Sequence, residues 1–552
     1  MAVTSNECKD FLVVEGQYIL RDDISLDTGV PSLTGGTLVS VVSVKYKEYP
    51  TQPISSNGEN TIDVFGEQNA NNRSTSSAEN TLVVDDMDDS SDVEKLQPAQ
   101  SQNIEPLSPI TDNISLTSPT QTSPMKPSNG SIPTSIEGKK EDDMFSFFNP
   151  VMKRKKTKNN ITKTTSSFVA KIVQNDNLTK ILANRQNEDT YLFFNSGRTF
   201  CWTDLTNKPK ELLSKVIFTK ALPMCHDVNQ LTRSCDHLDV IIGFSSGDII
   251  WFDPLCNKYY RLNKQGVINS SSVTMVKWMP GSENLFMASY SDGSIIIYDK
   301  DKDDQSFTAS TGNDEERFRV SRPSKNAKHN PVSHWQVSKK SVTAFAFSPD
   351  CQHVAIVSVD GCLRIIDFVE EVLYDTYSSY FGGLLCVCWS PDGRYVLTGG
   401  QDDLVTIWAF REQRIVARCQ GHQSWVTGVS FDPWRCDERN YRFGSVGEDT
   451  KLLLWDFSVN ALHKPKSPGS HRRASLASQS HATTVALRRN IVEHELTKNT
   501  VHPCLPRSEV AILQPVMAKS IDSDPLCSIT FREDSIITTC RKGHIKLWMR
   551  PS

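Results

Sequence analysis

The chain lacks the long apolar runs that a membrane span or a secretory leader needs. Its opening segment has one short apolar run, Phe11 to Val14, whereas a spanning helix takes about 20 apolar residues. Hydrophobic residues make up 38% of the 552 residues, and the mean hydropathy is −0.39. Values this low favour long polar segments that do not pack into a core. We therefore expect no membrane association and a chain that is folded only in part.

An excess of positive charge is also missing. The formal net charge is −5 and the isoelectric point is about 6.2. Domains that bind nucleic acid usually carry a basic patch or a clearly basic overall charge. The sequence therefore predicts no nucleic-acid partner.

Motifs for catalysis or metal binding are absent as well. There is no Gly-rich phosphate loop of standard spacing, no zinc-protease helix and no paired CxxC,. The 14 cysteines are scattered, as is typical of reduced core thiols in a cytosolic or nuclear protein. One cluster has zinc-type ligands at spacings that suit a tetrahedral site poorly: Cys225, His226, Cys235 and His237. We expect no enzyme activity, no metal and no cofactor.

What the sequence does contain is a repeat. Two units of one plan lie end to end between Tyr380 and Phe457. Each has an apolar strand, a Ser-Pro-Asp-Gly or Asp-Pro turn, a second strand, an Asp-containing turn and a third strand that reaches Trp. This order is typical of WD repeats, whose four-stranded blades take about 40–45 residues each. Five less regular units, from Ile161 to Trp548, bring the total to seven. The sequence predicts an all-β fold, a seven-bladed WD-repeat β-propeller with long disordered insertions.

The spacing of polar residues in these two units predicts a buried structural network. In each unit an Asp stands six positions before a Trp and four positions after a hydroxyl residue, and the second unit adds a His in its entry loop. Such chains suit a buried site because every member finds a partner. The His–Ser–Asp trio is also the set of a hydrolase triad, but no nucleophile elbow surrounds Ser445. The network residues are Thr398, Asp402 and Trp408 in the first unit and His422, Ser445, Asp449 and Trp455 in the second.

Composition divides the chain into ordered and disordered parts. The sequence stops four residues after Trp548, so the last unit lacks an outer strand and an open ring would expose its edges. We expect an N-terminal strand to close the ring, with Gly16–Leu20 as the first choice and Leu38–Tyr46 as the second. The predicted parts are residues 1–50 with the closing strand, a disordered Ser/Thr/Pro/acidic insertion at 51–160, blades one to six at 161–458, a disordered insert at 459–507 and the last blade at 508–552.

The first insertion carries three short features. Ser108, Ser118 and Ser123 stand directly before prolines, which makes proline-directed phosphorylation plausible. Leu82–Val84 precede an acidic run, as in segments that add to the edge of ubiquitin-like modifiers, although so short a motif favours a chance apolar triplet. Lys153–Lys156 fit a nuclear import signal or a solvated basic edge of the linker. We expect the protein in both the cytoplasm and the nucleus.

Aromatic residues in two entry loops are the candidate binding residues. Aligning the two regular units places Tyr380 at the position of His422 and Phe381 next to it, while Trp425 lies three residues beyond His422. Phe381 and Trp425 should therefore stand on one face of the ring, on neighbouring blades. Large aromatics in such loops either anchor a protein partner or fold inward between blades. The pattern alone leaves both interpretations open.

Longer stretches go beyond a generic WD repeat. YFGGLLCVCWSPDGRYVLTGGQDDLVTIW, GHQSWV, YRFGSVGEDT with LWDF, CHDVNQLT and VKWMPGSENLF closely resemble the family that contains WD repeat-containing protein 20, the dystrophia-myotonica WD-repeat protein and the fungal catabolite-repression protein creC. The similarity runs from about Ser166 to the C-terminus, and EGQYIL at Glu15–Leu20 is similar to the family's N-terminal strand. The 51–160 insertion departs from the family pattern, which leaves its role and any inherited regulation open.

The resemblance implies a non-catalytic cofactor that binds and activates a ubiquitin-specific protease together with a second WD-repeat subunit. We expect the activation to be allosteric and the chain alone to be a monomer. The resemblance also implies that Phe381 and Trp425, with the adjacent Tyr380, contact the protease. Two alternatives remain: a substrate receptor of a cullin ubiquitin ligase, and a general or phosphopeptide-reading scaffold. Cullin receptors often carry Trp-Asp-x-Arg at a blade end, but Trp408–Arg411 lacks the Asp and Trp455–Ser458 lacks the Arg.

Overall fold

A computed structural model describes a subset of the chain's residues. The described residues are 8–25, 36–45, 159–163, 166–183, 185, 188–310, 318–324, 327–458 and 500–551. They belong to one compact unit formed by residues 1–50 and 151–552. The 51–160 insertion up to residue 158, with Ser108, Ser118, Ser123, Leu82–Val84 and Lys153–Lys156, lies outside them, as does the insert from 459 to 499.

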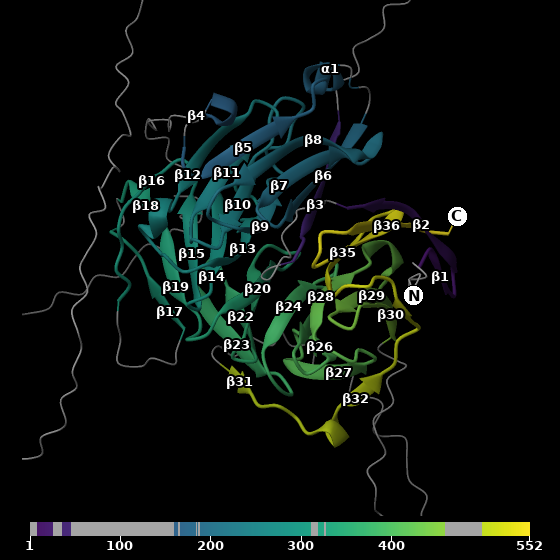
Figure 1. Ribbon diagram of the computed structural model, residues 1–552. Helices are drawn as coiled ribbons and strands as arrows, with labels where there is room; N and C mark the ends of the chain where they lie inside the picture. The colour runs from purple at the N-terminus through teal and green to yellow at the C-terminus, as the bar shows by residue number, and fades with distance from the viewer. Residues whose placement is uncertain are drawn as a thin grey trace, which may run out of the picture. The chain divides into compact units, whose positions relative to one another are not determined.

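Seven sheets of four or five strands, antiparallel except for the parallel edge strands β31 and β32, make the seven blades (Figure 1), which confirms the predicted propeller. The two regular sequence units form blades 5 and 6, and blade 4 precedes them. Blade 4 contains β20 (Val342–Phe347), β21 (His353–Ser358), β22 (Cys362–Asp367), β23 (Val372–Ser378) and β31 (Thr500–His502). Blade 5 contains β24 (Leu384–Trp389), β25 (Tyr395–Gly400), β26 (Leu404–Ala409), β27 (Arg414–Gln420) and β32 (Ala511–Leu513). Blade 6 contains β28 (Val426–Phe431), β29 (Asn440–Gly447), β30 (Lys451–Ser458) and β33 (Met517–Ser520), with the 3-10 helix η3 (Pro433–Arg435) between its first two strands.

Blades 2 and 3 come from the less regular units. Blade 2 contains β9 (Pro223–Val228), β10 (Val240–Phe244), β11 (Ile249–Asp253), β12 (Lys258–Leu262) and β4 (Asn159–Asn160), and η2 (Lys264–Gly266) follows it. Blade 3 contains β13 (Val273–Trp278), β14 (Leu285–Tyr290), β15 (Ser294–Asp299), β19 (Ser333–Gln336) and β17 (Arg319–Ser321). Beside it, β16 (Asp303–Asp304) pairs in parallel with β18 (His329–Asn330).

The N-terminal segment contributes to two blades. Blade 7 contains β34 (Leu526–Phe531), β35 (Ser535–Cys540), β36 (Ile545–Met549), β2 (Gly16–Ile24) and β1 (Asp10–Val13). Blade 1 contains β3 (Val39–Lys45), β6 (Glu188–Ser196), β7 (Thr199–Asp204), β8 (Lys208–Phe218) and β5 (Val169–Gln174), with η1 (Ile161–Lys163) and α1 (Leu178–Ala183) nearby in the chain. The first-choice segment Gly16–Leu20 lies in β2, which pairs with β36, as the purple and yellow strands of Figure 1 show. The second choice overlaps β3, which pairs with β6 as the inner strand of blade 1.

Two details differ from the sequence prediction. The predicted blades began at residue 161, but the inner strand of blade 1 is β3, and β5, the first longer strand after residue 161, pairs with β8 at the outer edge. The second insert was expected to extend to residue 507, yet β31 begins at Thr500 and pairs with β23. The middle strands β15 and β25 are buried throughout, because neighbouring blades cover both of their faces,.

Threonine side chains on the first or second strand of a blade tie consecutive blades together. The Oγ1 of Thr343 donates to the carbonyl of Leu384 at 2.7 Å, and the Oγ1 of Thr427 donates to that of Leu526 at 2.7 Å. Between blades 7 and 1, the Oγ1 of Thr539 donates to the carbonyl of Thr37 at 2.5 Å. These side chains satisfy buried carbonyls at the inner rim.

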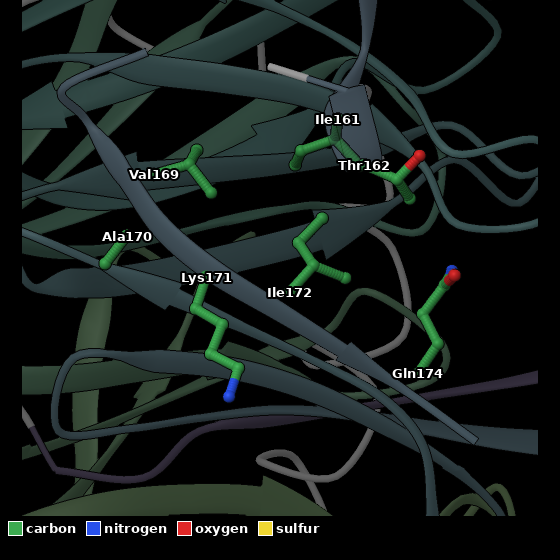
Figure 2. Close-up of a pocket in the computed structure, with 7 residues that line it drawn as sticks. All are labelled: Ile161, Thr162, Val169, Ala170, Lys171, Ile172 and Gln174. Atoms are coloured by element: carbon green, nitrogen blue, oxygen red, sulfur yellow. The ribbon is translucent and has the colours of Figure 1, made fainter. Parts of the chain in front are cut away.

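The outer edge of blade 1 carries a small hollow of about 270 Å³ (Figure 2). Figure 2 shows Val169, Lys171 and Ile172 along β5 on one side of it and Ile161 and Thr162 on the other. Among the residues that the structure describes, no helix is both long and apolar enough to cross a membrane.

Candidate functional site

The loop between β23 and β24 presents two aromatic rings to solvent. Phe381 is 71% exposed and Tyr380 is 49% exposed. The loop backbone is fixed at both ends: the Ser379 N–H donates to the carbonyl of Gly361 at 2.7 Å, and the Gly383 N–H donates to Oε1 of Gln401 at 2.8 Å. A rigid loop that holds an exposed phenylalanine is suited to anchoring a partner.

Gly382 is required in this loop by its conformation and its surroundings. Its φ is +64°, a left-handed conformation that favours glycine,. A Cβ at this position would lie 2.9 Å from Cβ of Gln401, in the turn between β25 and β26. The glycine therefore lets the loop pack against that turn while Phe381 points outward.

Trp425 occupies the corresponding loop of the next blade, between β27 and β28. Its side chain is 43% exposed, and its carbonyl accepts from the N–H of Glu448, in the turn between β29 and β30, at 2.9 Å. Both loops join the outer strand of one blade to the inner strand of the next, so they open on the same face of the ring. We call the exposed rings of Tyr380, Phe381 and Trp425 the aromatic face.

Tyr380 does not take the place of the blade 6 histidine. Its ring lies over the guanidinium of Arg418, with 4.7 Å between the guanidinium carbon and the ring centroid. Arg418 lies on β27 and its side chain is buried. An aromatic ring attracts a cation at this distance through its electron-rich face. Arg418 had no signal in the sequence other than a charge within an apolar strand.

The predicted network of blade 6 is present in full. The Nδ1 of His422 lies 3.0 Å from Oδ1 of Asp449, and its Nε2 lies 2.8 Å from Oγ of Ser445. The Nε1 of Trp455 donates to the same Oγ at 2.8 Å. Burial opposes ionisation of Asp449, but the hydrogen bond and charge of His422 outweigh it and lower the pKa of the carboxyl,. Ser445 is completely buried, so no substrate reaches its hydroxyl.

Blade 5 builds only part of the same network. The Nε1 of Trp408 donates to Oγ1 of Thr398 at 2.9 Å, as the spacing predicted. Asp402 instead accepts from the N–H of Leu404 at 3.2 Å. Burial raises the pKa of Asp402 to about 6, and the backbone bond and the charge of Arg418 offset this only in part,. Without an imidazole beside it, the Asp402 carboxylate has too few favourable contacts to offset the cost of burying its charge.

The surface next to Phe381 therefore carries carboxylates. Asp402 and Asp403 occupy the turn that follows Gln401, and burial and the charge of Asp449 raise the pKa of Asp403. A phosphopeptide reader needs a basic ring at this place, and the β25–β26 turn supplies the opposite charge.

The zinc-type cluster is engaged in other contacts. Cys225 and His226 are buried on β9, with the His226 ring 5.1 Å from that of Phe200. Burial lowers the pKa of His226 to about 3. The Nδ1 of His237 lies 2.7 Å from Oδ2 of Asp253, and its bonds to Asp239 and Asp253 raise its pKa to about 9. His237 is thus a member of a polar network in blade 2.

Comparisons with known proteins agree with this architecture. The family model "WD domain, G-beta repeat" matches residues 329–367 and 372–409, which cover most of blade 4 and the first three strands of blade 5. The chain is 39% identical over 409 residues to the UBP9-binding protein bun62 of Schizosaccharomyces pombe (strain 972 / ATCC 24843). That alignment covers 70% of this chain and 75% of the relative.

Proposed function

The chain belongs to the family of WD-repeat proteins that includes the UBP9-binding protein of Schizosaccharomyces pombe, and from this membership we propose that it binds a ubiquitin-specific protease. The relative's name states that it binds UBP9. The single structural observation that supports the proposal here is the aromatic face, with Phe381 and Trp425 exposed on neighbouring blades. Exposed aromatic rings on fixed loops are typical anchors of protein interfaces.

In this proposal the chain itself is not catalytic and acts as a cofactor of the protease. Activation requires that the chain bind the active arrangement of the protease more tightly than the inactive one. A second WD-repeat subunit joins the complex, the chain alone is a monomer, and the complex forms in cytoplasm and nucleus. The aromatic face is the contact that the first experiment should test.

The experiment is a pull-down of the full chain from cell extract, with ubiquitin cleavage assayed in the eluate. Wild type is compared with a Phe381→Ala, Trp425→Ala double variant. We expect a ubiquitin-specific protease and its activity with wild type and a loss of at least about tenfold in the variant, since interface anchors contribute about 2 kcal/mol or more each. The control is Trp434→Ala, an aromatic 48% exposed in η3, at the opposite end of the strands.

Two results would count against the proposal. If wild type retains a cullin adaptor and no cleavage activity, the ligase-receptor alternative replaces it. If Trp434→Ala loses the protease as fully as the double variant, the aromatic face is not the contact.

Activation is tested separately with purified protease. Added chain should raise kcat at saturating ubiquitin substrate, because the active arrangement becomes more populated. A passive scaffold would leave kcat unchanged while still co-purifying.

A further inference from the structure

The first strand after the 459–499 insert, β31, pairs with β23, the strand that precedes the loop of Tyr380 and Phe381. The pairing is parallel, in the register Asp375 with Thr500 and Tyr377 with His502. β23 ends at Ser378, three residues before Phe381. We call residues 500–505 the clasp. Figure 1 shows β31 beside β23, with the chain continuing to β32 at the edge of blade 5.

His502 is the first anchor of the clasp. Its ring stacks on that of Tyr377, with centroids 4.4 Å apart and planes at 11°. Its Nε2 lies 2.9 Å from Oδ1 of Asp375, which is fully buried and also accepts from the hydroxyl of Tyr377 at 3.2 Å. The clasp thus completes a buried polar cluster four to six residues before Phe381.

Arg418 is the second anchor, and it joins the clasp to the aromatic loop. Its Nη2 donates to the carbonyl of Leu505 at 2.8 Å and contacts Sγ of Cys504 at 3.3 Å. The face of the same guanidinium carries the ring of Tyr380. One side chain therefore contacts both the clasp and the residue next to Phe381.

Because Arg418 is charged and buried, the conformation of the loop around Tyr380 depends on the contacts that the clasp makes with it. Arg418 is only 4% exposed, and within the described parts of the chain its Nη1 has no hydrogen-bond partner. A buried cation is unfavourable unless other interactions offset its loss of water. Here those interactions come from the ring of Tyr380, from the charge of the Asp402 carboxyl and from the Leu505 carbonyl. Detaching the clasp would remove the Leu505 carbonyl that accepts from the guanidinium and would favour a rearranged loop.

We propose that the clasp is a positioning element of the aromatic face, with His502 and Arg418 as positioning residues that hold residues 379–383 in the shape the partner binds. The identity of the partner rests on the function proposed above, whereas the effect of the clasp on the loop does not. By linkage, a partner that prefers the held loop also stabilises the attached clasp. The clasp thereby connects the end of the 459–499 insert to the partner site.

The alternative is that the clasp only covers the edges of the sheets. In that case its loss would lower the melting temperature without altering the loop. Hydrogen exchange of the loop amides separates the two roles, and it can be measured on the free protein without any protease.

The test uses His502→Ala, Arg418→Met and Arg418→Lys in the full chain. We expect His502→Ala and Arg418→Met to speed exchange in residues 379–383 about tenfold and to weaken protease binding at least about fivefold, as loss of one or two buried contacts should. Arg418→Lys keeps a cation under Tyr380 and should recover most of both effects. The control is Val516→Thr, an exposed residue further along the same returning segment.

Each outcome decides one part of the proposal. If neither His502→Ala nor Arg418→Met changes the hydrogen exchange of residues 379–383, the clasp does not hold the loop. This conclusion stands whether or not protease binding changes. Faster exchange with unchanged affinity shows that the clasp holds the loop but does not position it for the partner. If wild type binds no protease, the proposed function fails, and hydrogen exchange of the loop alone shows whether the clasp holds it. If Arg418→Met unfolds, the test rests on His502→Ala. Slower hydrogen exchange of the clasp in the wild-type complex than in the free protein would support the proposal independently.

Discussion

Two aspartates at equivalent positions show how one neighbouring residue decides the state of a buried group. Asp449 has the imidazole of His422 beside it, and its pKa is lowered. Asp402 has no imidazole beside it, because the aligned position holds Tyr380, whose ring lies over Arg418. Burial therefore raises the pKa of Asp402 to about 6. The repeat pattern predicts that both aspartates occupy the same turn, but their ionisation depends on one side chain.

The raised pKa of Asp402 predicts a pH-dependent cost to stability. Between about pH 4 and pH 6 the native state binds more protons here than the unfolded state, so stability falls as pH rises through this window,. Asp402→Asn should therefore raise the melting temperature at pH 7.5, by about 2 °C, and the gain should shrink towards pH 5. Differential scanning fluorimetry across this range measures it.

Asp449→Asn is the matched control, and its expected effect has the opposite sign. The folded-state pKa of Asp449 is lowered, so its stabilising contribution is present above the unfolded pKa, and the variant should melt lower at pH 7.5. Equal shifts in the two variants would contradict the assignment.

The sequence predicted the network residues better than the exposed ones. Spacing alone placed Trp408 against Thr398 and Trp455 against Ser445, because a Trp six positions after the turn meets the hydroxyl four positions before it. It left open whether Phe381 faced solvent, since that depends on how the loop packs against the neighbouring turn, including Gln401. Arg418 was missed because its partners come from segments distant in sequence.

At the scale of elements, the N-terminal hairpin shows what pattern analysis can and cannot assign. It predicted a closing strand and offered two segments as alternatives. The structure uses both, β2 as an outer strand of blade 7 and β3 as the inner strand of blade 1. Strand pattern gives no position within a sheet, so it could not show that β3 is the inner strand of blade 1 and β5 the outer one. The clasp strand β31 is too short and too polar to stand out.

The hairpin β1–β2 is held by an aromatic stack. The rings of Phe11 and Tyr18 lie 4.9 Å apart, and Phe11 lies 5.3 Å from the ring of Trp548 on β36. Tyr18 is fully buried, and its hydroxyl donates to Oε1 of Glu15 at 3.0 Å. Glu15 in turn accepts from Arg442 on β29, which joins the hairpin to blade 6.

Removing the Tyr18 ring should therefore loosen the whole closure. Tyr18→Ala is expected to lower the free energy of unfolding by about 3–5 kcal/mol, the usual cost of deleting a buried aromatic ring. Leu12→Ala on the same hairpin, 73% exposed, should change it by less than about 0.5 kcal/mol. Urea unfolding of both variants gives the comparison. Similar losses of unfolding free energy in the two would mean that the buried face of the hairpin does not stabilise the propeller.

For the whole molecule, the ring is continuous because the chain joins its last blade to its first. Ile24 of β2 and Leu192 of β6 share one buried cluster with Ile537 and Leu547 of blade 7. The number of blades was predictable from the repeat period, even where the units had lost their tryptophan. The pairing of the first-choice segment with β36, more than 500 residues away, was also predicted, whereas the use of β3 as the inner strand of blade 1 was not.

Deleting residues 1–25 should open the ring and expose the hydrogen-bonding edge of β36, along with the aromatic surface of Trp548. We expect a lower melting temperature and self-association through this edge, measured by fluorimetry and light scattering. A synthetic peptide of residues 8–25 supplied in trans should restore the melting temperature in proportion to the logarithm of its concentration, since it binds only the folded state. The same peptide with Tyr18→Ala should bind far more weakly, because it lacks the ring that stacks on Phe11. If the truncated chain melts like the full chain, β2 does not stabilise the ring, and closure rests on β3 and the contacts between blades 7 and 1 alone.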